Sequence, residues 1–95
     1  MRVRVSFYGA VRDVAGVDEE TVQLPPTADV RGLLERLGEK HGPALRDRVL
    51  RRDGTTWPSV AILLNGSNIS LNQGLDTLLA EGDAVAIVPV IAGGR

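Results

Sequence analysis

The chain has 95 residues and a mass of 10.1 kDa, enough for one small domain and too little for a second hydrophobic core. It contains no cysteine, which excludes a disulfide framework, a thiolate metal site and a cysteine nucleophile, and its single histidine, His41, argues against a histidine-ligated zinc site. Eleven basic and twelve acidic residues give a net charge of −1, which argues against nonspecific nucleic-acid binding.

No segment of the sequence is suited to crossing a membrane or to export. The longest apolar run covers residues 84–92 and is interrupted by Pro89, so it is too short to span a bilayer. Residues 1–5 alternate charged and apolar side chains and lack the apolar core of a signal peptide. We therefore expect a cytoplasmic protein without a membrane partner.

The first part of the chain is predicted to form a β-hairpin. Apolar and polar side chains alternate over residues 1–8, which is typical of a strand with one buried face. Phe7 falls on the apolar face and is expected in the core, whereas Tyr8 falls on the opposite face and is a candidate for a partner interface. Residues 9–18 are expected to form a connecting loop, and residues 20–24 a second, antiparallel strand.

A long helix is predicted to follow. A proline pair ends the second strand, and Thr27 is suited to cap the helix, with Asp29 in the first turn where the helix dipole favours an acid. A Gly-Pro pair ends the helix near His41, which is expected to complement the dipole or to be solvated and not to be catalytic. The apolar stripe of this helix, at helical spacing, is Val30, Leu33, Leu34 and Leu37.

The segment after the long helix is rich in arginine. Apolar residues at 45, 49 and 50 predict a short helix or turn, and residues 51–58 predict a polar loop in which Trp57 either caps the core or contacts a partner. The local basic cluster is either a docking patch for an acidic partner or a solvated helix end, and we favour the solvated helix end. Its members are Arg46, Arg48, Arg51 and Arg52.

The next elements are predicted to be a buried or central strand and its hairpin partner. Residues 60–64 are apolar throughout, which is typical of a strand covered on both faces or placed inside a sheet. Asn65-Gly66 is a strong signal for a two-residue hairpin turn. A short return strand is therefore expected around residues 68–70.

The end of the chain combines a turn, a strand and a tail. Residues 74–78 predict a helical turn that directs Leu75 and Leu78 inward, and residues 84–91 predict a last strand that is apolar on both faces. Since one helix covers one face of a sheet, part of this strand is expected to be exposed as a docking patch, unless the loop over residues 51–58 covers it.

The order of these elements predicts an α+β fold. A hairpin, a crossover helix and strands that return beside the first one describe the β-grasp, or ubiquitin-like, fold, with a mixed sheet of four to five strands and one main helix on one face. We expect a single domain over residues 1–91 and a flexible tail over residues 92–95.

An ordered set of motifs resembles the MoaD/ThiS family of ubiquitin-like sulfur carriers, and the resemblance is closest to the MoaD branch, the small subunit of molybdopterin synthase. It covers essentially the whole chain, and no single motif in it is specific. The motifs are residues 3–12, the VAILLNG sequence over 60–66, GLDTLL over 74–79, EGDAVAIVP over 81–89 and the double glycine at 93–94.

The resemblance implies a carrier and not an enzyme. In that family a ubiquitin-activating-type adenylating enzyme uses ATP to activate the C-terminal glycine, which then becomes a thiocarboxylate and delivers sulfur inside an acceptor enzyme. The resemblance therefore implies that Gly94 bears the thiocarboxylate, preceded by Gly93 and Ala92, and that this chain itself binds no cofactor or metal. The implied docking residues are Tyr8, Val88, Pro89, Val90 and Ile91.

Arg95 departs from the pattern of the family. Only a terminal carboxylate can be adenylated, so the sequence with Arg95 in place cannot be activated at Gly94. A peptidase removes Arg95, or Arg95 does not belong to the natural chain, or the tail binds a partner noncovalently; we favour the peptidase.

Several functions remain open at this stage. The leading hypothesis is sulfur transfer to the large subunit of molybdopterin synthase. The same fold and tail would serve a carrier for cysteine, thiamine or tRNA thiolation. A different class is a ubiquitin-like modifier joined through Gly94 to lysines of target proteins, and a third is a noncovalent interaction module.

Overall fold

The computed structural model describes residues 1–90, and five strands and three α-helices make up most of this part. The two segments of 3-10 helix, η1 and η2, lie between strands β4 and β5. In chain order the elements are β1 (Arg2–Phe7), α1 (Gly9–Ala15), β2 (Glu19–Gln23), α2 (Val30–His41), α3 (Pro43–Val49), β3 (Val60–Leu64), β4 (Ser67–Asn68), η1 (Ile69–Leu71), η2 (Gly74–Asp76) and β5 (Ala84–Pro89).

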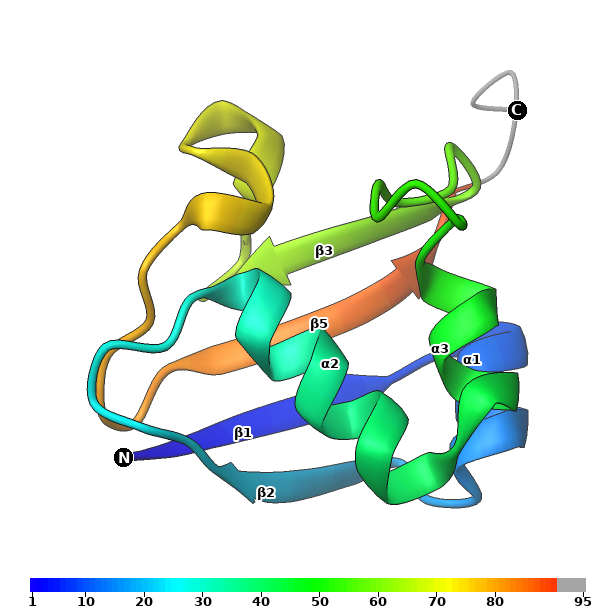
Figure 1. The fold of residues 1–95 in the computed structure, drawn as a ribbon, viewed down its shortest axis with the longest axis horizontal. Helices are drawn as coiled ribbons and strands as arrows, with labels where there is room; N and C mark the ends of the chain where they lie inside the picture. The colour runs from blue at the N-terminus through cyan, green and yellow to red at the C-terminus, as the bar shows by residue number, and fades with distance from the viewer. Residues whose placement is uncertain (91–95) are drawn as a thin grey trace.

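The strands form one mixed sheet with the order β2-β1-β5-β3-β4 (Figure 1). Strand β1 pairs antiparallel with β2 and parallel with β5, while β3 pairs antiparallel with both β5 and β4. The last strand of the chain is therefore inserted in the middle of the sheet. This arrangement confirms the predicted α+β fold with a mixed sheet.

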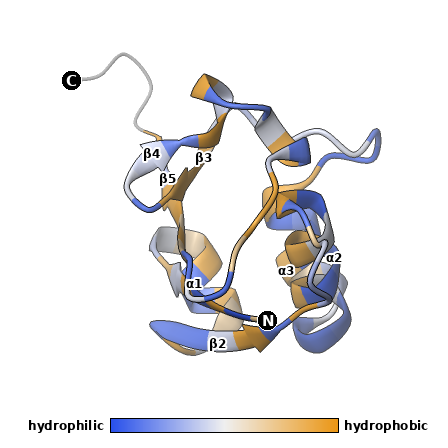
Figure 2. Ribbon diagram, turned by 90° about the vertical axis from the view of Figure 1, so that its left-hand side faces the viewer, coloured by the Kyte–Doolittle hydropathy of each residue, from blue (hydrophilic) through white to orange (hydrophobic). Residues whose placement is uncertain are grey.

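The core lies between the sheet and helix α2. The apolar stripe of α2 (Val30, Leu33, Leu34 and Leu37) is buried, as its spacing predicts. It faces the inward side chains of the central strands, among them Val3, Val5, Phe7, Ile62, Val85 and Ile87. Figure 2 shows α2 and α3 side by side on one side of the molecule, with β3 and β5 on the other.

Helix α2 begins two residues later than the sequence predicts. Its N-cap is Asp29, whose carboxylate accepts a hydrogen bond from the Gly32 N–H at 2.8 Å. Thr27 was the expected cap, and it lies outside the helix because the carbonyl of Ala28 and the backbone of Val30 are instead bonded to Leu79 and Thr77. The long-range pairing thus moves the start of the helix.

Residues 9–18 are not a simple loop, because they contain helix α1. This helix is only seven residues long and buries Val11 alone, so it has no apolar stripe that the sequence could reveal. It ends at Gly16, which has a left-handed backbone and donates its N–H to the Arg12 carbonyl at 2.9 Å. The helix contacts α3 and β5 and closes one end of the sheet.

The predicted second short helix is confirmed as α3, and the Asn65-Gly66 turn is also confirmed. Pro43 occupies the first turn of α3, and Leu45 and Val49 are buried. Asn65 and Gly66 both have positive φ, at 51° and 88°, as a type I′ turn requires. The return strand β4 is shorter and one residue earlier than predicted, since Ile69 begins a 3-10 helix.

The expectation that Leu78 points inward is wrong. Its side chain is 67% exposed, whereas Leu75 is half-buried against the core. Helical structure ends at Asp76, and Leu78 forms an extended bridge with Asp29. Alternation along that extended segment turns Thr77 and Leu79 inward and Leu78 outward.

The two apolar strands are each buried on one face only. In β3, Ile62 is buried and its neighbours are half-buried, so the strand is internal to the sheet but not covered on both sides. In β5, Val85 and Ile87 are buried while Ala86 and Val88 are partly exposed. Strand β5 ends at Pro89, and Ile91, which was expected to belong to it, lies outside the described residues.

Candidate functional site

The described part of the chain ends at Val90, one residue after strand β5 and just before the predicted tail. Val90 extends the β5–β3 pairing by one residue, because its N–H donates to the Ser59 carbonyl at 2.9 Å. Its side chain is 46% exposed. The predicted tail residues Ala92, Gly93, Gly94 and Arg95, together with Ile91, lie outside the described residues. The tail therefore starts from a strand that is held on both sides by β1 and β3.

An apolar surface covers the outer side of the sheet beside this exit. Register places Ala61 opposite Val88 and Leu63 opposite Ala86 on the face away from the buried Ile62–Ile87 pair. We call this surface the outer face. Its members are Tyr8, Ala61, Leu63, Ala86, Val88 and Val90, all half-buried or exposed.

Tyr8 joins the outer face through the parallel pairing of β1 with β5. Its N–H donates to the Ile87 carbonyl at 3.1 Å, and its backbone is extended, so the alternation of β1 continues through it. Phe7 is accordingly 1% exposed and Tyr8 is 50% exposed. This confirms the prediction that Phe7 lies in the core, and it places Tyr8 beside Val88.

Pro89 lies on the opposite side of β5 from Val88 and Val90, since alternation groups it with Ile87. It is exposed at the sheet end and packs against Gly9. A Cβ added at Gly9 would lie 3.2 Å from the Pro89 Cγ, and Gly9 has a φ of +63°, which favours glycine. The structure thus places three of the predicted docking residues, Tyr8, Val88 and Val90, on one surface and gives Pro89 a contact with the start of α1.

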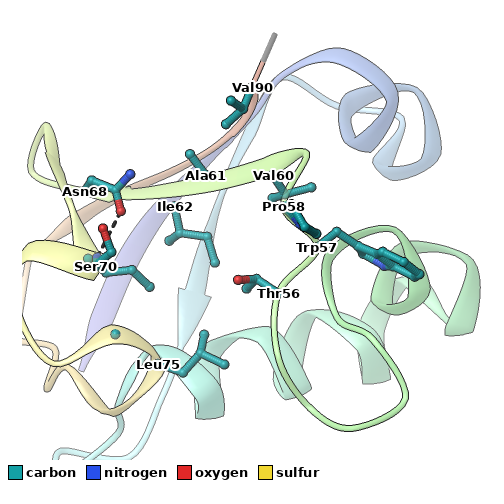
Figure 3. A pocket seen from close by; sticks show the side chains of 12 residues that line it. Thr56, Trp57, Pro58, Val60, Ala61, Ile62, Asn68, Ser70, Leu75 and Val90 are labelled. Atoms are coloured by element: carbon teal, nitrogen blue, oxygen red, sulfur yellow. Dashed lines mark hydrogen bonds between the residues drawn. The ribbon is translucent and has the colours of Figure 1, made fainter. Parts of the chain in front are cut away.

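A hollow lies beside the exit of the tail, on the inner side of β3 (Figure 3). Its volume is about 280 Å³, and none of the described residues that line it is charged. Val60 and Ile62 point into it from β3, opposite Thr56 and Leu75, and Val90 lies above it. Strand β4 pairs only with Leu63 and Leu64, so within residues 1–90 the edge of β3 along this hollow has no neighbouring strand.

The most buried charged cluster holds β2 to the end of α2. The Glu20 carboxylate, whose side chain is 10% exposed, bonds Lys40 at 2.5 Å and also the His41 ring. Burial of Glu20 acts to raise its pKa, but the hydrogen bonds from Lys40 and His41 outweigh it, and the pKa is lowered. The His41 ring also meets Phe7 edge-on at 5.9 Å, so of the two expected placements the solvated one is wrong, whereas His41 does lie in the last turn of α2, where a basic group complements the helix dipole.

Residues 1–90 lack the side-chain groups of several other kinds of site. That part of the chain has no group of three or more His, Asp or Glu side chains placed to hold a metal ion. None of its helices is long and apolar enough to cross a membrane. The outer face and the exit of the tail are therefore the candidate site in this part of the chain.

The sequence model of the ThiS family matches residues 5–94. The chain belongs to the ThiS family. It is 32% identical over 94 residues to small archaeal modifier protein 3 of Haloferax volcanii, with 99% of this chain and all of that protein covered. It is also 32% identical to the molybdopterin synthase sulfur carrier subunit of Mycobacterium tuberculosis, over 99% of both chains.

A solved structure of the same kind shows the same fold. The crystal structure of SAMP1 from Haloferax volcanii superposes with a TM-score of 0.84 at 29% identity, covering 99% of this chain and all of that one. The resemblance to MoaD/ThiS ubiquitin-like sulfur carriers and the β-grasp fold are thus confirmed. This ThiS-family chain is a member of a group that comprises sulfur carriers and ubiquitin-like modifiers.

The family match sharpens two points about the site. It runs through Gly93 and Gly94 and leaves Arg95 outside. It also includes the whole outer face, of which the sequence identified Tyr8, Val88 and Val90 but not Ala61 or Leu63. Those two residues occupy a strand that appears uniformly apolar in sequence, and only the register with β5 shows which side chains face outward.

Proposed function

We propose that this ThiS-family chain is a sulfur carrier for molybdopterin synthesis, activated at Gly94. The observation that carries the proposal is the full-length match to the family together with a double glycine placed just beyond a strand whose outer face is apolar. The relative from Mycobacterium tuberculosis, named a molybdopterin synthase sulfur carrier subunit, supports the particular pathway.

The proposed chemistry takes place on the terminal carboxylate. A carboxylate oxygen of Gly94 attacks the α-phosphate of ATP, which forms an acyl adenylate and releases pyrophosphate. Hydrosulfide (HS⁻) then attacks the acyl carbon, AMP leaves and the S–H proton is lost, so that the product is a thiocarboxylate. This chain supplies the reacting carbon and oxygen atoms, and the partner enzyme binds ATP and supplies the catalytic groups.

The residues of this chain act in the proposal by docking and presentation. An apolar surface at the base of the tail suits association with an enzyme, because burying it removes nonpolar area from water. Glycines at 93 and 94 allow the walls of a narrow channel to approach the backbone closely, since they carry no Cβ. The outer face thus fixes where the tail begins, and the glycines let it enter.

Arg95 has to be removed before Gly94 can react. The proposal therefore includes a peptidase that cleaves the Gly94–Arg95 bond and leaves a carboxylate at Gly94. Cleavage after the second glycine gives the chain the C-terminus at which the family match also stops.

A second candidate is a ubiquitin-like modifier, favoured by the 32% identity with small archaeal modifier protein 3. In that case a lysine amine of a target protein attacks the acyl adenylate, an isopeptide bond forms and AMP leaves. Carriers that deliver sulfur to cysteine, thiamine or tRNA would use the same activation as the leading proposal and differ only in the acceptor enzyme.

The decisive experiment compares three forms of the chain ending at Gly93, Gly94 and Arg95. Each is incubated with the adenylating enzyme of the same cells, ATP and a sulfur donor, and is analysed by intact mass. We expect only the form ending at Gly94 to gain the mass of an oxygen-to-sulfur exchange. The loaded carrier is then given to the molybdopterin synthase large subunit and precursor, and molybdopterin is measured.

The outcomes separate the candidates. If the thiocarboxylate forms but no molybdopterin is made, the chain is a sulfur carrier that serves another acceptor enzyme. A ladder of isopeptide conjugates in cells, lost on deletion of the double glycine, selects the modifier. Absence of adenylation in the form ending at Gly94 contradicts every version in which the tail is activated.

A further inference from the structure

Most basic side chains in residues 1–90 already hold a carboxylate of the same chain. Four arginines in residues 1–90 have no ion pair in that range. Arg4 is one of them and lies on the polar part of the outer sheet surface. The other three lie in the last turn of α3 or just after it, and they are Arg48, Arg51 and Arg52. The ion pairs are Arg2–Glu81, Arg12–Asp18, Arg31–Asp76, Arg36–Glu39, Lys40–Glu20 and Arg46–Glu35.

The structure thereby divides the cluster that the sequence presents as a unit. Arg46 makes two hydrogen bonds to the Glu35 carboxylate, at 3.1 and 3.2 Å, so it belongs to the packing of α3 on α2. Arg48 and Arg52 are exposed. Arg51 lies over the ring of Trp57, with its guanidinium carbon 5.3 Å from the ring centre, as in a cation–π contact.

We name Arg48, Arg51, Arg52 and Trp57 the basic corner. Trp57 is 42% exposed, and its indole N–H donates to the Asp47 carbonyl at 2.8 Å, which ties it to the last turn of α3 next to Arg48. The Arg51 Nε is buried and has no hydrogen-bond partner among residues 1–90. The corner thus offers cationic groups around an aromatic ring.

The loop that carries the corner is held in one conformation by its own hydrogen bonds. The Arg51 N–H donates to the Thr55 carbonyl at 2.7 Å, and Leu50 and Thr56 form an antiparallel bridge. Asp53 accepts hydrogen bonds from the hydroxyl and backbone N–H of Thr55, which lower its pKa. A loop that is ordered before binding loses little conformational entropy when a partner arrives.

The corner is adjacent to the exit of the tail. The Trp57 carbonyl accepts a hydrogen bond from the Val60 N–H at 3.0 Å, and Ser59 pairs with Val90, the last described residue. Trp57 and Val90 also line the same hollow (Figure 3). An enzyme that encloses the tail therefore passes within reach of the corner.

We propose that the basic corner is a second docking surface, which binds acidic side chains at the mouth of the enzyme channel that receives the tail. The inference rests on the proposed function, because it assumes that an enzyme encloses the tail. Arginine guanidinium groups form strong, geometrically specific pairs with carboxylates, and none of these three guanidinium groups forms an ion pair within residues 1–90.

The partner surface is a protein and not a nucleic acid. Asp47 and Asp53 lie within the same segment, so the corner carries an excess of only one positive charge, and the whole chain is net negative. Phosphate backbones require a broader positive field for useful affinity. Residues 54–90 contain no further lysine or arginine that could broaden the positive field, and their charged side chains are the carboxylates of Asp76, Glu81 and Asp83.

The test uses charge reversal in the chain ending at Gly94. The double variant R48E/R52E is compared with wild type in ATP–pyrophosphate exchange catalysed by the adenylating enzyme of the same cells, and binding of both is measured by calorimetry without ATP. We expect the KM for the carrier and the Kd to rise at least about 10-fold at low salt, with kcat unchanged, and the difference to shrink in high salt.

Two controls isolate the charge. R48K/R52K keeps the charge and is expected to stay within about 3-fold of wild type, and R36E reverses an exposed arginine on α2 and is expected to leave the KM unchanged. Thermal unfolding verifies that each variant is folded, which is expected because both substituted side chains of the corner are exposed.

The inference is overturned if wild type is adenylated and R48E/R52E has the same KM, while the proposed function then stands. It is also overturned if R36E raises the KM equally, or if wild type binds single-stranded RNA and the double variant does not. Failure of wild type both to bind the enzyme and to be adenylated overturns the corner and the proposed function together.

Discussion

Tyr8 offers the sharpest test of the outer face. An aromatic side chain buries about 150–250 Å² when it is fully enclosed, and Tyr8 is 50% exposed. Association with an enzyme can therefore remove about 75–125 Å² more from water. At about 25 cal/mol per Å², this corresponds to about 2–3 kcal/mol of binding free energy.

We expect Tyr8→Ala to weaken binding by about 10-fold to 100-fold. The effect on the binding free energy is smaller than the buried area alone gives, because side-chain ordering and desolvation of polar groups offset part of it. The assay is calorimetric titration of the chain ending at Gly94 into the adenylating enzyme, with pyrophosphate exchange as a second readout. Tyr8→Phe keeps the ring and is expected to stay within about 3-fold of wild type.

The matched control is Leu71→Ala. Leu71 is 79% exposed in η1, away from the outer face, so its loss is expected to leave the affinity unchanged. Equal weakening by Leu71→Ala and Tyr8→Ala, or normal affinity in folded Tyr8→Ala, refutes the assignment of the docking surface. A contrast is provided by Phe7→Ala, which is expected to cost about 3–5 kcal/mol of stability because Phe7 is a core residue.

Three further predictions concern stability. Gly9→Ala is expected to lower the unfolding free energy by about 1–2 kcal/mol in denaturant titration, and more than Gly16→Ala, because both have positive φ but only Gly9 would meet a neighbour. Asp29→Ala removes the cap of α2 and is expected to cost about 1 kcal/mol by thermal unfolding. Glu20→Gln is expected to cost about 1–2 kcal/mol near pH 7. Since folding lowers the pKa of Glu20 below its ordinary 4.5, that difference should disappear in acid titrations as the pH falls below about 4.5.

Much of the fold is predictable from local sequence because the patterns are strong. Alternation identifies β1, and helical spacing identifies the stripe of α2. Helix α1 escapes prediction because it buries only Val11, and its existence depends on contacts with α3 and β5 that lie far away in sequence. Leu78 is misassigned for the same reason, since its bridge to Asp29 overrides the helical pattern around it.

In the candidate site, too, local patterns predict some residues, whereas long-range pairing determines the others. The outward positions of Tyr8 and Val88 each follow from alternation along a single strand, β1 for Tyr8 and β5 for Val88, so the sequence identifies both residues. Ala61 and Leu63 require the register between β3 and β5, which no local pattern specifies. The separation of Arg46 from Arg48 likewise depends on Glu35, eleven residues earlier on another helix.

The position of β5 explains how docking and tail delivery can be coupled. The strand is hydrogen-bonded to β1 on one side and β3 on the other, and each neighbour contributes a residue to the outer face, Tyr8 and Ala61. An enzyme that binds this face therefore contacts all three strands, next to Val90, which continues the β5–β3 pairing through Ser59. From Val90 to Gly94 covalent geometry allows a reach of at most about 14 Å. The Gly94 Cα must accordingly lie within about 14 Å of the Val90 Cα, and the reacting phosphate or sulfur of a partner lies only a few bonds beyond it. A partner whose channel is deeper than this cannot use the carrier without disrupting the sheet.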